Sequence, residues 1–433
     1  MIPWPPLPKE RHKRTNDVIN KSIKRYLPQK ILNFINSCDF NKKQDLIIIC
    51  DMITRISIYR GKSKNKLGNK IYSNVFTEIP KYYFKDIITG SDNLSSAFSY
   101  LKDNSIVITD GTYHYHTNYK KCIGYKFNDS LISVVGTTTI SDGCLVKRII
   151  KNKNNRKMNI SNSIKDYRKY FINNFKLRYE EAFKWVEDEY NLGIKGLKEG
   201  GPEWIECVNK YNYSAMSIHM IEDRDVFFKR NTTNGRIDTN LTNLRSELRQ
   251  FIDIKDLRQI DIKNSQPIFL SLLLDSLLCG EMKFTKEKKS FMDKCFRGDL
   301  YEYIFSFFYK KTQKQLTRKE IKNIIFAIFY SKPGSYQKEK NIFKDIFPEI
   351  LNWIEKRKGN NHEKFAIELQ KMESSMCIDM ILPLLHLNGI SCFTVHDSWI
   401  VKQDDLDNAL NIIKNSFMDK YGMIPSFSQE KLT

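Results

Sequence analysis

Two short apolar runs near the C-terminus constrain the fold most strongly, because a His-Asp pair lies between them. Residues 393–401 read FTVHDSWIV, with β-branched and aromatic residues on both sides of His396 and Asp397. Such runs are typical of β-strands, and a polar pair between them predicts a hairpin with the pair at its tight turn. A charged residue in this setting is costly to bury without a partner or an ion. The hairpin is therefore expected to project Asp397 from a rigid support.

A second aspartate ends another apolar run. The stretch QIDIKNSQPIFLSLLL places Asp261 shortly before Gln266, Pro267 and a strongly apolar helix. Most aspartates at such a place cap a helix. If Asp261 instead lies on a strand beside Asp397, the two carboxylates can bridge two Mg²⁺ ions about 3.5–4 Å apart, with Mn²⁺ as an alternative. That arrangement serves in-line phosphoryl or nucleotidyl transfer.

A third stretch, RKEIKNIIFAIFY, repeats a functional residue type every fourth position. Arg318, Lys322, Phe326 and Tyr330 share one helix face, because four residues turn the helix by only about 40° beyond a full turn. Two cations followed by two rings suit a triphosphate at one end of the stripe and a base at the other. Basic side chains lying over an aromatic packing edge explain each residue singly, but not their order.

Composition indicates a basic protein that binds nucleic acid. The net charge of +21 favours a polyanionic partner, although a lysine-rich proteome is the alternative explanation. The nine cysteines are scattered without a C-x-x-C pair, so neither a zinc site nor a disulfide framework is expected. No apolar run approaches the length of a membrane span, and a cytoplasmic location is predicted.

The N-terminal half predicts a small α+β domain. Residues 44–59 form a buried helix or strand, which periodicity cannot decide. A short helix, a turn at Gly90 and an amphipathic helix from Asp92 then lead to a hairpin with its turn at Asp110-Gly111. This is the order of elements in a winged helix, which grips duplex nucleic acid, and an ordinary α+β scaffold explains it equally well. No acidic pattern of a 3′–5′ proofreading exonuclease is present.

The three C-terminal stretches together resemble motifs A, B and C of the family A DNA polymerases and the related phage-type single-subunit RNA polymerases. Their order matches, and the motif B spacing matches position by position. The resemblance implies that Asp261 and Asp397 are the catalytic, metal-binding pair. It also implies that Arg318 and Lys322 bind the phosphates of the incoming nucleotide, while Phe326 and Tyr330 shape the site of the nascent base pair.

Further stretches extend the resemblance over residues 231–433. TTNGRIDTNLTNL resembles a family segment that contacts primer and template, which implies this role for Arg236 and Asn243, with Thr233 beside them. GDLYEYI, at residues 298–304, is similar to the stretch between motifs A and B. ELQKMESSM, around Gln370 and Glu373, is a looser match to the helix that touches the duplex minor groove. His396 is expected to support its turn and to contact the primer terminus.

Three departures from the family leave the choice of sugar open. Ser398 follows the motif C pair, as in the RNA enzymes, where the DNA enzymes carry Glu. Gln266 replaces the motif A Glu that helps to exclude the 2′-OH, and it could either block that hydroxyl or donate a hydrogen bond to it. Ser331 replaces the usual Gly after the motif B Tyr, which stiffens the chain there.

We therefore expect an α+β right-hand polymerase with palm and fingers, a reduced helical thumb, and a small N-terminal domain. The predicted organisation is a flexible basic arm at 1–20, a nucleic-acid-binding-like domain at 21–145, a thumb-like region at 146–230 and a palm and fingers at 231–433. The predicted function is DNA polymerase activity without proofreading, acting on a primer-template duplex and nucleoside triphosphates, in the setting of a phage, plasmid or other mobile element or of a host defence system. An RNA polymerase or primase is the nearest alternative, and a non-catalytic nucleic-acid-binding protein is the other.

Overall fold

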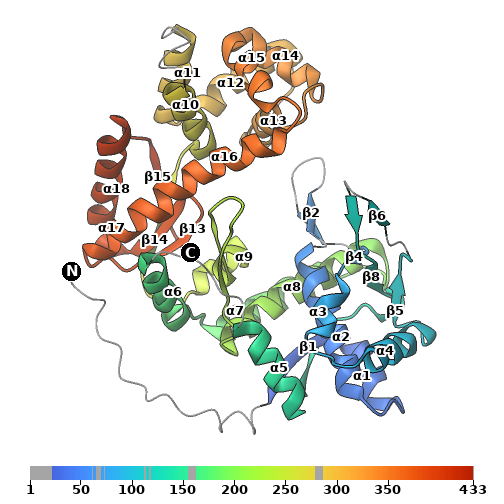
Figure 1. Ribbon diagram of the computed structural model, residues 1–433. Helices are drawn as coiled ribbons and strands as arrows, with labels where there is room; N and C mark the ends of the chain where they lie inside the picture. Colours follow the sequence, from blue (N-terminus) through green and yellow to red (C-terminus); the bar gives the residue numbers. More distant parts are fainter. Residues whose placement is uncertain are drawn as a thin grey trace. The chain divides into compact units, whose positions relative to one another are not determined.

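The computed structural model describes residues 22–60, 62–64, 70–72, 74–111, 114–116, 119–154, 162–277 and 286–432 of the chain (Figure 1). The arm predicted at 1–20 lies outside these residues. The described residues form two compact units of mixed α+β structure. The first, here the N-terminal unit, contains the described residues of 22–154 and 176–225, and the second, here the C-terminal unit, contains those of 162–175 and 226–432.

The N-terminal unit consists of short strands, helices of eight residues or more, and the shorter helical segments α3 and η2. Its elements are β1 (Ile23–Pro28), α1 (Gln29–Ser37), α2 (Lys43–Arg60), β2 (Lys62–Lys64), β3 (Lys70–Tyr72), β4 (Thr77–Glu78), α3 (Lys81–Lys85), α4 (Ser91–Asp103), β5 (Val107–Thr109), β6 (His114–His116), β7 (Tyr119–Lys121), β8 (Gly124–Phe127), η2 (Asp129–Leu131), β9 (Val135–Ile140), α5 (Gly143–Asn154), α7 (Tyr179–Gly193) and α8 (Pro202–Glu222).

One hydrophobic core holds α1, α2, α4 and the strands around them together. The segment predicted at 44–59 as a helix or a strand is the helix α2. Residues 45–51 of this helix are buried on every side, and Ile49 among them is 0% exposed. A helix surrounded in this way shows no apolar stripe, because no face of it meets water, and this is why periodicity could not identify it.

The hairpin predicted at Asp110-Gly111 is wrong in its strand pairing. β5 pairs with β8, and the intervening β6 and β7 pair with each other. The Asp110 carboxylate accepts the backbone N–H of Gly124 at 2.9 Å and pairs with Lys121 at 3.1 Å, so it joins the two chain segments at the base of an inserted hairpin. Gly111 has a φ of 65°, as a turn residue would, but the strand after the Asp-Gly pair is not the partner of β5.

The C-terminal unit combines one four-stranded sheet with many helices. Its elements are α6 (Asn162–Asn174), β10 (Phe228–Arg230), β11 (Ile237–Thr239), α9 (Asn240–Asn243), η3 (Ser246–Phe251), β12 (Leu257–Ile262), α10 (Ser265–Leu277), α11 (Lys286–Arg297), α12 (Leu300–Thr312), α13 (Arg318–Tyr330), α14 (Gln337–Ile346), α15 (Pro348–Lys358), α16 (His362–Ser374), the π-helix η4 (Ser375–Ile381), α17 (Leu382–Leu387), β13 (Phe393–Val395), β14 (Ser398–Lys402), η5 (Gln403–Asp405), α18 (Leu406–Tyr421) and β15 (Phe427–Lys431).

The sheet of the C-terminal unit is antiparallel throughout, in the order β13-β14-β12-β15. β13 and β14 form the hairpin predicted from FTVHDSWIV, and Val395 pairs with Ser398 so that only two residues make the turn. Trp399, Ile400 and Val401 are each 0% exposed. This burial on both faces makes the hairpin a firm support for its turn.

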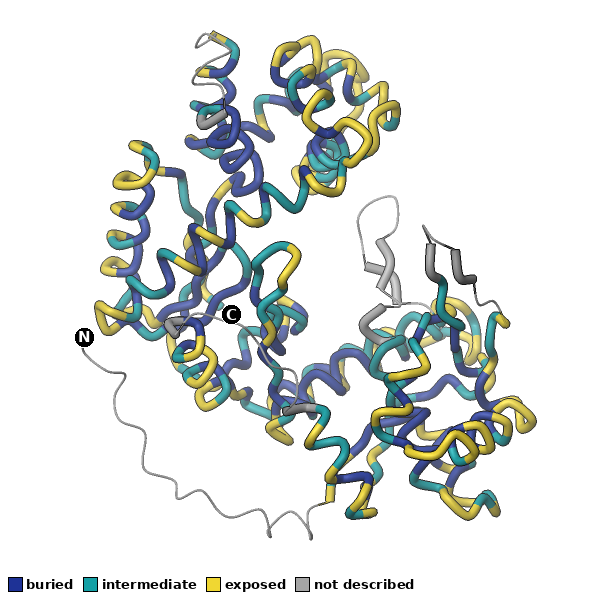
Figure 2. The backbone as a smooth tube through the Cα atoms, in the orientation of Figure 1, coloured by how far each residue is buried: buried dark blue, intermediate teal, exposed yellow. Residues whose placement is uncertain are grey.

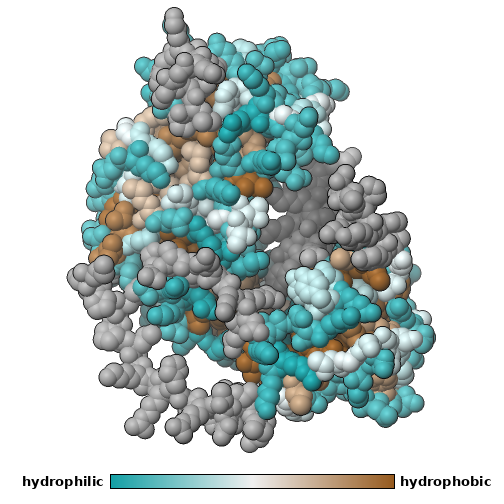
Figure 3. Space-filling view, viewed as in Figure 1, coloured by the Kyte–Doolittle hydropathy of each residue, from teal (hydrophilic) through white to brown (hydrophobic). Residues whose placement is uncertain are grey.

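Helices cover the sheet and also form a cluster of their own. α10 packs against α16, and the tube through the start of α10 is dark blue in Figure 2 because its residues are buried. The helices α11 to α15 pack around a cluster of phenylalanines that includes Phe291, Phe343 and Phe347. Most of the described surface that is visible in Figure 3 is hydrophilic. No helix in the described part of the chain combines the length and apolar character needed to cross a membrane.

Candidate functional site

The sheet brings the two predicted catalytic aspartates together. Asp261 lies in β12 directly opposite Ser398 of β14, and Asp397 is the residue before Ser398. Opposite residues of an antiparallel pair have Cα atoms about 4.5–5.5 Å apart, so Asp261 on its strand and Asp397 in the adjacent turn lie at the same end of the sheet. His396 adopts a φ of 59°, a conformation that is uncommon outside glycine and that this two-residue turn requires.

The two aspartates influence each other electrostatically. The pKa of Asp261 is raised to about 7, first by burial and next by the charge of Asp397, while Lys322 acts in the opposite direction. Two carboxylates held this close repel each other unless a proton or a cation lies between them. Within the described ranges no group of three or more His, Cys, Asp or Glu side chains is placed to hold a metal. Mg²⁺ commonly takes only one or two protein carboxylates and completes its shell with waters and substrate phosphates, which fits this pair.

The stripe predicted on residues 318–330 lies on the helix α13. Thr317 and Glu320 form a capping box at its N-terminus, which explains why the helix begins at Arg318. The Lys322 Nζ lies 5.6 Å from the centroid of the Phe326 ring, and the Phe326 and Tyr330 rings lie 5.8 Å apart. The four side chains therefore follow one another along one face, as the spacing predicts.

Arg318 stands at the exposed end of this stripe. Its Nε donates to Glu302 at 2.9 Å, and its guanidinium lies 5.3 Å from the centroid of the Tyr301 ring. Both partners of the ion pair are more than half exposed, and such a pair contributes only about 0–1 kcal/mol. Arg318 can therefore leave Glu302 for a stronger anion at little cost.

A buried carboxylate, Glu373 of α16, joins four segments of the C-terminal unit. It is 1% exposed and accepts hydrogen bonds from Arg236 Nε at 2.9 Å and from Ser265 Oγ at 3.0 Å. The Nε2 of Gln266 also donates to it, and the Oε1 of Gln266 accepts from the Tyr330 hydroxyl at 2.5 Å. The side chain of Gln266 is thus held at both ends. We call Arg236, Ser265, Gln266, Tyr330 and Glu373 the Glu373 network.

The pKa of Glu373 is raised to about 7, because burial opposes its charge more strongly than its partners favour it. Asp397 adds to this effect by repulsion, and Arg236 and Gln266 act against it. The Glu373 network therefore extends electrostatically to the aspartate pair, and a proton or cation gained at one place changes the charge balance at the other.

The loop between β10 and β11 docks on α16. Asn234 donates to the side chain of Gln370 at 3.0 Å, and the Ser374 hydroxyl donates to the Asn234 carbonyl at 2.9 Å. Gly235 has a φ of 74°, and a Cβ there would lie 2.5 Å from Ser374 Oγ, so the contact requires glycine. The Thr233 backbone N–H donates to the Asn231 side chain, which shapes the exposed tip of the loop.

Two predicted primer or template residues stand apart from these contacts. Asn243 ends the short helix α9, and its side chain makes no hydrogen bond to any described residue. His396 is half-buried at the hairpin turn, and its Nδ1 has no hydrogen-bond partner among the described residues. Burial and the charge of Arg236 lower the pKa of His396, so its ring is neutral near pH 7.

Sequence reasoning missed the importance of three residues. Glu373 appeared only as part of a loose match, and a charged residue inside the run KMESSMCIDM is the signal that pointed to a buried role. Ser265 was not singled out. Lys358 is also buried, and its Nζ donates to the carbonyls of Ile328 at 2.9 Å and Ser331 at 3.1 Å, so it closes the C-terminal end of α13.

Comparisons with known proteins find similarity at the level of structure. No protein-family model matches the sequence, and no curated protein matches it. The chain is similar to the POL domain of Pol1 from M. smegmatis, solved in complex with a DNA primer-template and dNTP. The TM-score is 0.43 at 9% sequence identity, and the similarity covers 66% of this chain and 72% of that chain. Pol1 is a family A DNA polymerase, which is the family that the sequence motifs resemble.

Proposed function

We propose that this chain is a template-directed nucleotidyltransferase of the family A type that extends a DNA primer with deoxynucleotides. The observation that carries the proposal is the strand register that sets Asp261 beside Asp397. Burial and, after it, the charge of Asp397 raise the pKa of Asp261, while Lys322 of the stripe lowers it. A carboxylate pair next to a row of two cations and two rings has the charges that a nucleoside triphosphate and its metal ions need.

The aspartates are the proposed ligands of Mg²⁺. When bound there, the metal supplies the positive charge that lowers the pKa of the attacking hydroxyl and offsets charge on the leaving pyrophosphate. Asp261 and Asp397 orient the reacting groups from a rigid sheet. His396 is neutral, so it can approach the primer terminus without adding a charge.

The stripe on α13 is the proposed binding surface for the incoming nucleotide. Lys322 is exposed and acts on Asp261, so a phosphate bound to it would lie close to the aspartate pair. Arg318 gives up a weak surface ion pair for a second phosphate contact. Phe326 and Tyr330 present aromatic faces against which the base and sugar can pack.

Gln266 is the proposed determinant of sugar choice. It is 8% exposed and held between Tyr330 and Glu373, so one N–H and one lone pair of its amide are used and the side chain is fixed in place. The fixed side chain is proposed to exclude a 2′-hydroxyl by its volume. This favours deoxynucleotides over ribonucleotides. An RNA polymerase or primase is the second candidate, and the absence of an acidic residue at Gln266 and Ser398 favours it.

Subdomain roles follow from this assignment as further proposals. The sheet β13-β14-β12-β15 with α16 and α18 acts as the palm, and the helices α11 to α15 act as the fingers. The helical region at 146–230 is the proposed thumb. The domain at 21–145 is the proposed second nucleic-acid-binding part, and Arg236, Thr233, Asn243 and Gln370 are proposed to contact primer and template.

Extension of a labelled primer on a DNA template tests the proposal, with Mg²⁺ and with dNTPs or NTPs in separate reactions. Asp397→Ala should abolish extension, and Asp404→Ala, an exposed carboxylate shortly after the same strand, serves as the matched control. Extension by dNTPs alone supports the DNA polymerase. Extension by NTPs alone moves the chain to the RNA-synthesising alternative. Duplex binding without synthesis by any of these proteins would contradict a catalytic role.

A further inference from the structure

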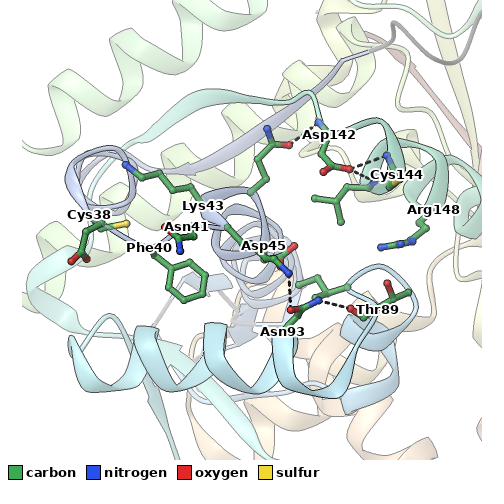
Figure 4. A pocket seen from close by; sticks show the side chains of 15 residues that line it. Cys38, Phe40, Asn41, Lys43, Asp45, Thr89, Asn93, Asp142, Cys144 and Arg148 are labelled. Carbon is green, nitrogen blue, oxygen red and sulfur yellow. Dashed lines mark hydrogen bonds between the residues drawn. The ribbon is translucent and has the colours of Figure 1, made fainter.

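The N-terminal unit contains a pocket that the proposed function does not use. Its volume is about 760 Å³, within the range of about 300–1,000 Å³ that is usual for small-molecule sites. It is lined by the segment that connects α1 to α2 and by the first turns of α2, α4 and α5 (Figure 4). All of these residues belong to one compact unit.

A buried carboxyl of this pocket lacks a partner. Asp45 lies in the first turn of α2, is 7% exposed, and its side chain is among those that line the pocket in Figure 4. No described residue makes a hydrogen bond or ion pair with its carboxyl. Asp142, in contrast, accepts the backbone N–H groups of Cys144 and Leu145 at 2.8 and 2.9 Å, and Asp39 accepts the Tyr100 hydroxyl at 2.9 Å.

The carboxyl of Asp45 faces the space of the pocket. Burial raises the pKa of Asp45 and the charge of Asp142 adds to this, while the charges of Lys42 and Arg148 lower it. Its oxygens are not among the described side-chain atoms that are fully shut off from solvent without a partner, so they meet the water of the pocket. A ligand that displaces this water must offer donors in its place, and Asp45 therefore favours a ligand with N–H groups.

Cations stand beside the carboxylates of the same pocket. Lys42, Lys43 and Arg148 line it together with Asp39, Asp45 and Asp142, and α2, α4 and α5 all begin at its wall. Helix N-termini carry partial positive charge and attract anions. Lys42 donates one bond to Asn93 at 2.7 Å, and one nitrogen of Arg148 donates to the Ile87 carbonyl, so each has further N–H groups for a ligand.

An aromatic ring completes the lining. Phe40 is half-buried, and its ring centroid lies 4.8 Å from that of Tyr100. Such a ring offers a flat apolar surface to a base. The pocket thus combines an acceptor that needs donors, a ring, and cations for an anionic group.

We propose that this pocket binds a guanine nucleotide, with the base edge on Asp45, the base against Phe40, and the phosphate at Arg148 and Lys42. A carboxylate only accepts hydrogen bonds, and guanine presents two adjacent N–H donors, N1–H and the N2 amine, on one edge. Adenine presents a donor beside an acceptor there and matches it less well. The nucleotide is either free or the end of a nucleic acid strand. This assignment does not depend on the proposed polymerase activity.

Isothermal titration calorimetry of the full chain with GMP, AMP and XMP, in EDTA, tests the pocket. GMP should bind at least about tenfold more tightly than AMP, the discrimination expected of a two-bond base contact. Asp45→Asn should lose about tenfold in GMP affinity and gain in XMP affinity, because its amide donates where the carboxylate accepted. Asp39→Asn, a carboxylate at the same pocket that already has a partner, should leave GMP binding unchanged.

Further variants test the proposed phosphate contact and show whether GMP binds to the C-terminal unit instead. Arg148→Gln should weaken GMP and AMP alike, while Lys147→Gln, an exposed neighbour outside the pocket, should weaken neither. Lys322→Ala, which removes a proposed phosphate contact of the stripe on α13, should bind GMP as the wild type does, which excludes the proposed polymerase site as the source. Thermal unfolding shows whether the Asp45→Asn variant folds. If it does not fold, the difference in affinity between GMP and AMP and the effect of Arg148→Gln test the proposed binding mode without it.

A 5′-phosphorylated oligonucleotide that begins with dG distinguishes the two sources. Tighter binding of the oligonucleotide than of GMP identifies a strand end, and equal or weaker binding identifies a free nucleotide. The proposal is overturned if GMP does not bind at millimolar concentration, if AMP binds as well as GMP, or if Arg148→Gln and Asp45→Asn, both folded, leave GMP binding unchanged.

Discussion

Replacing Glu373 by Gln should destabilise the C-terminal unit more than any surface substitution on the same helix. The carboxylate accepts charge-assisted bonds from Arg236 and further bonds from Ser265 and Gln266. A Gln side chain of the same shape turns an NH₂ group toward these donors and leaves at least one of them buried without an acceptor, which costs about 1–3 kcal/mol. The pKa of Glu373 is raised to about 7, chiefly by burial, so the protonated side chain is the form that stabilises the fold, and the full loss is expected near pH 5.

Hydrogen exchange of β12 and β14 in the intact chain, followed by mass spectrometry, measures this loss in the C-terminal unit alone. A global unfolding curve would mix the two units, because chains of several compact units depart from two-state behaviour. Glu368→Gln is the control, since Glu368 lies on the same helix and forms a half-exposed pair with Arg357 at 2.7 Å, for which about 0–1 kcal/mol is expected.

The pH dependence sharpens the test. The pKa of Glu373 in the folded chain is about 7, above its ordinary value, so its contribution to stability is present near pH 4 and is lost as the pH rises through 7. Gln does not titrate, so the difference between wild type and Glu373→Gln should shrink as the pH rises. The double variant Gln266→Glu with Glu373→Gln restores a carboxyl acceptor opposite the amide and should recover part of the loss. Equal effects of the Glu373 and Glu368 substitutions near pH 5 would refute the role assigned to the Glu373 network.

Two further substitutions follow from the same unit. Asp261 has a folded pKa of about 7, above its ordinary value, so its contribution to stability is present below about pH 4 and is lost as the pH rises toward 7. Asp261→Asn should therefore raise the melting temperature at pH 8 but not at pH 4. Added Mg²⁺ should stabilise only the wild type at pH 8. Lys358→Met should leave the carbonyls at the C-terminal end of α13, including that of Ser331, without their donor. The free energy of opening of α13, measured by hydrogen exchange, should fall by about 2–4 kcal/mol. Lys356→Met, at an exposed position, should change this free energy by less than about 0.5 kcal/mol. No pH dependence for Asp261→Asn, or equal effects of the two lysine substitutions, would contradict these predictions.

The amino-acid sequence by itself determined the local features of the candidate site. Thr317 and Glu320 begin the helix that carries the stripe, and the spacing of Arg318 to Tyr330 places its members on one face, because both depend only on residues within a few positions. The two-residue turn at His396-Asp397 was predicted for the same reason. Binary patterns and turn residues act over short distances and can be read directly.

Only the tertiary structure decided which distant residues meet. The register of β12 against β14 sets Asp261 beside Asp397, and the docking of α16 buries Glu373 against Gln266; neither contact is encoded in any short window of sequence. The wrong pairing at Asp110 has the same origin, since the strand after a turn pairs wherever burial and hydrogen bonding are best satisfied. Burial also sets the charge state of Asp261, Glu373 and Asp45, because the cost of an ionised carboxyl depends on the solvent that the folded chain excludes.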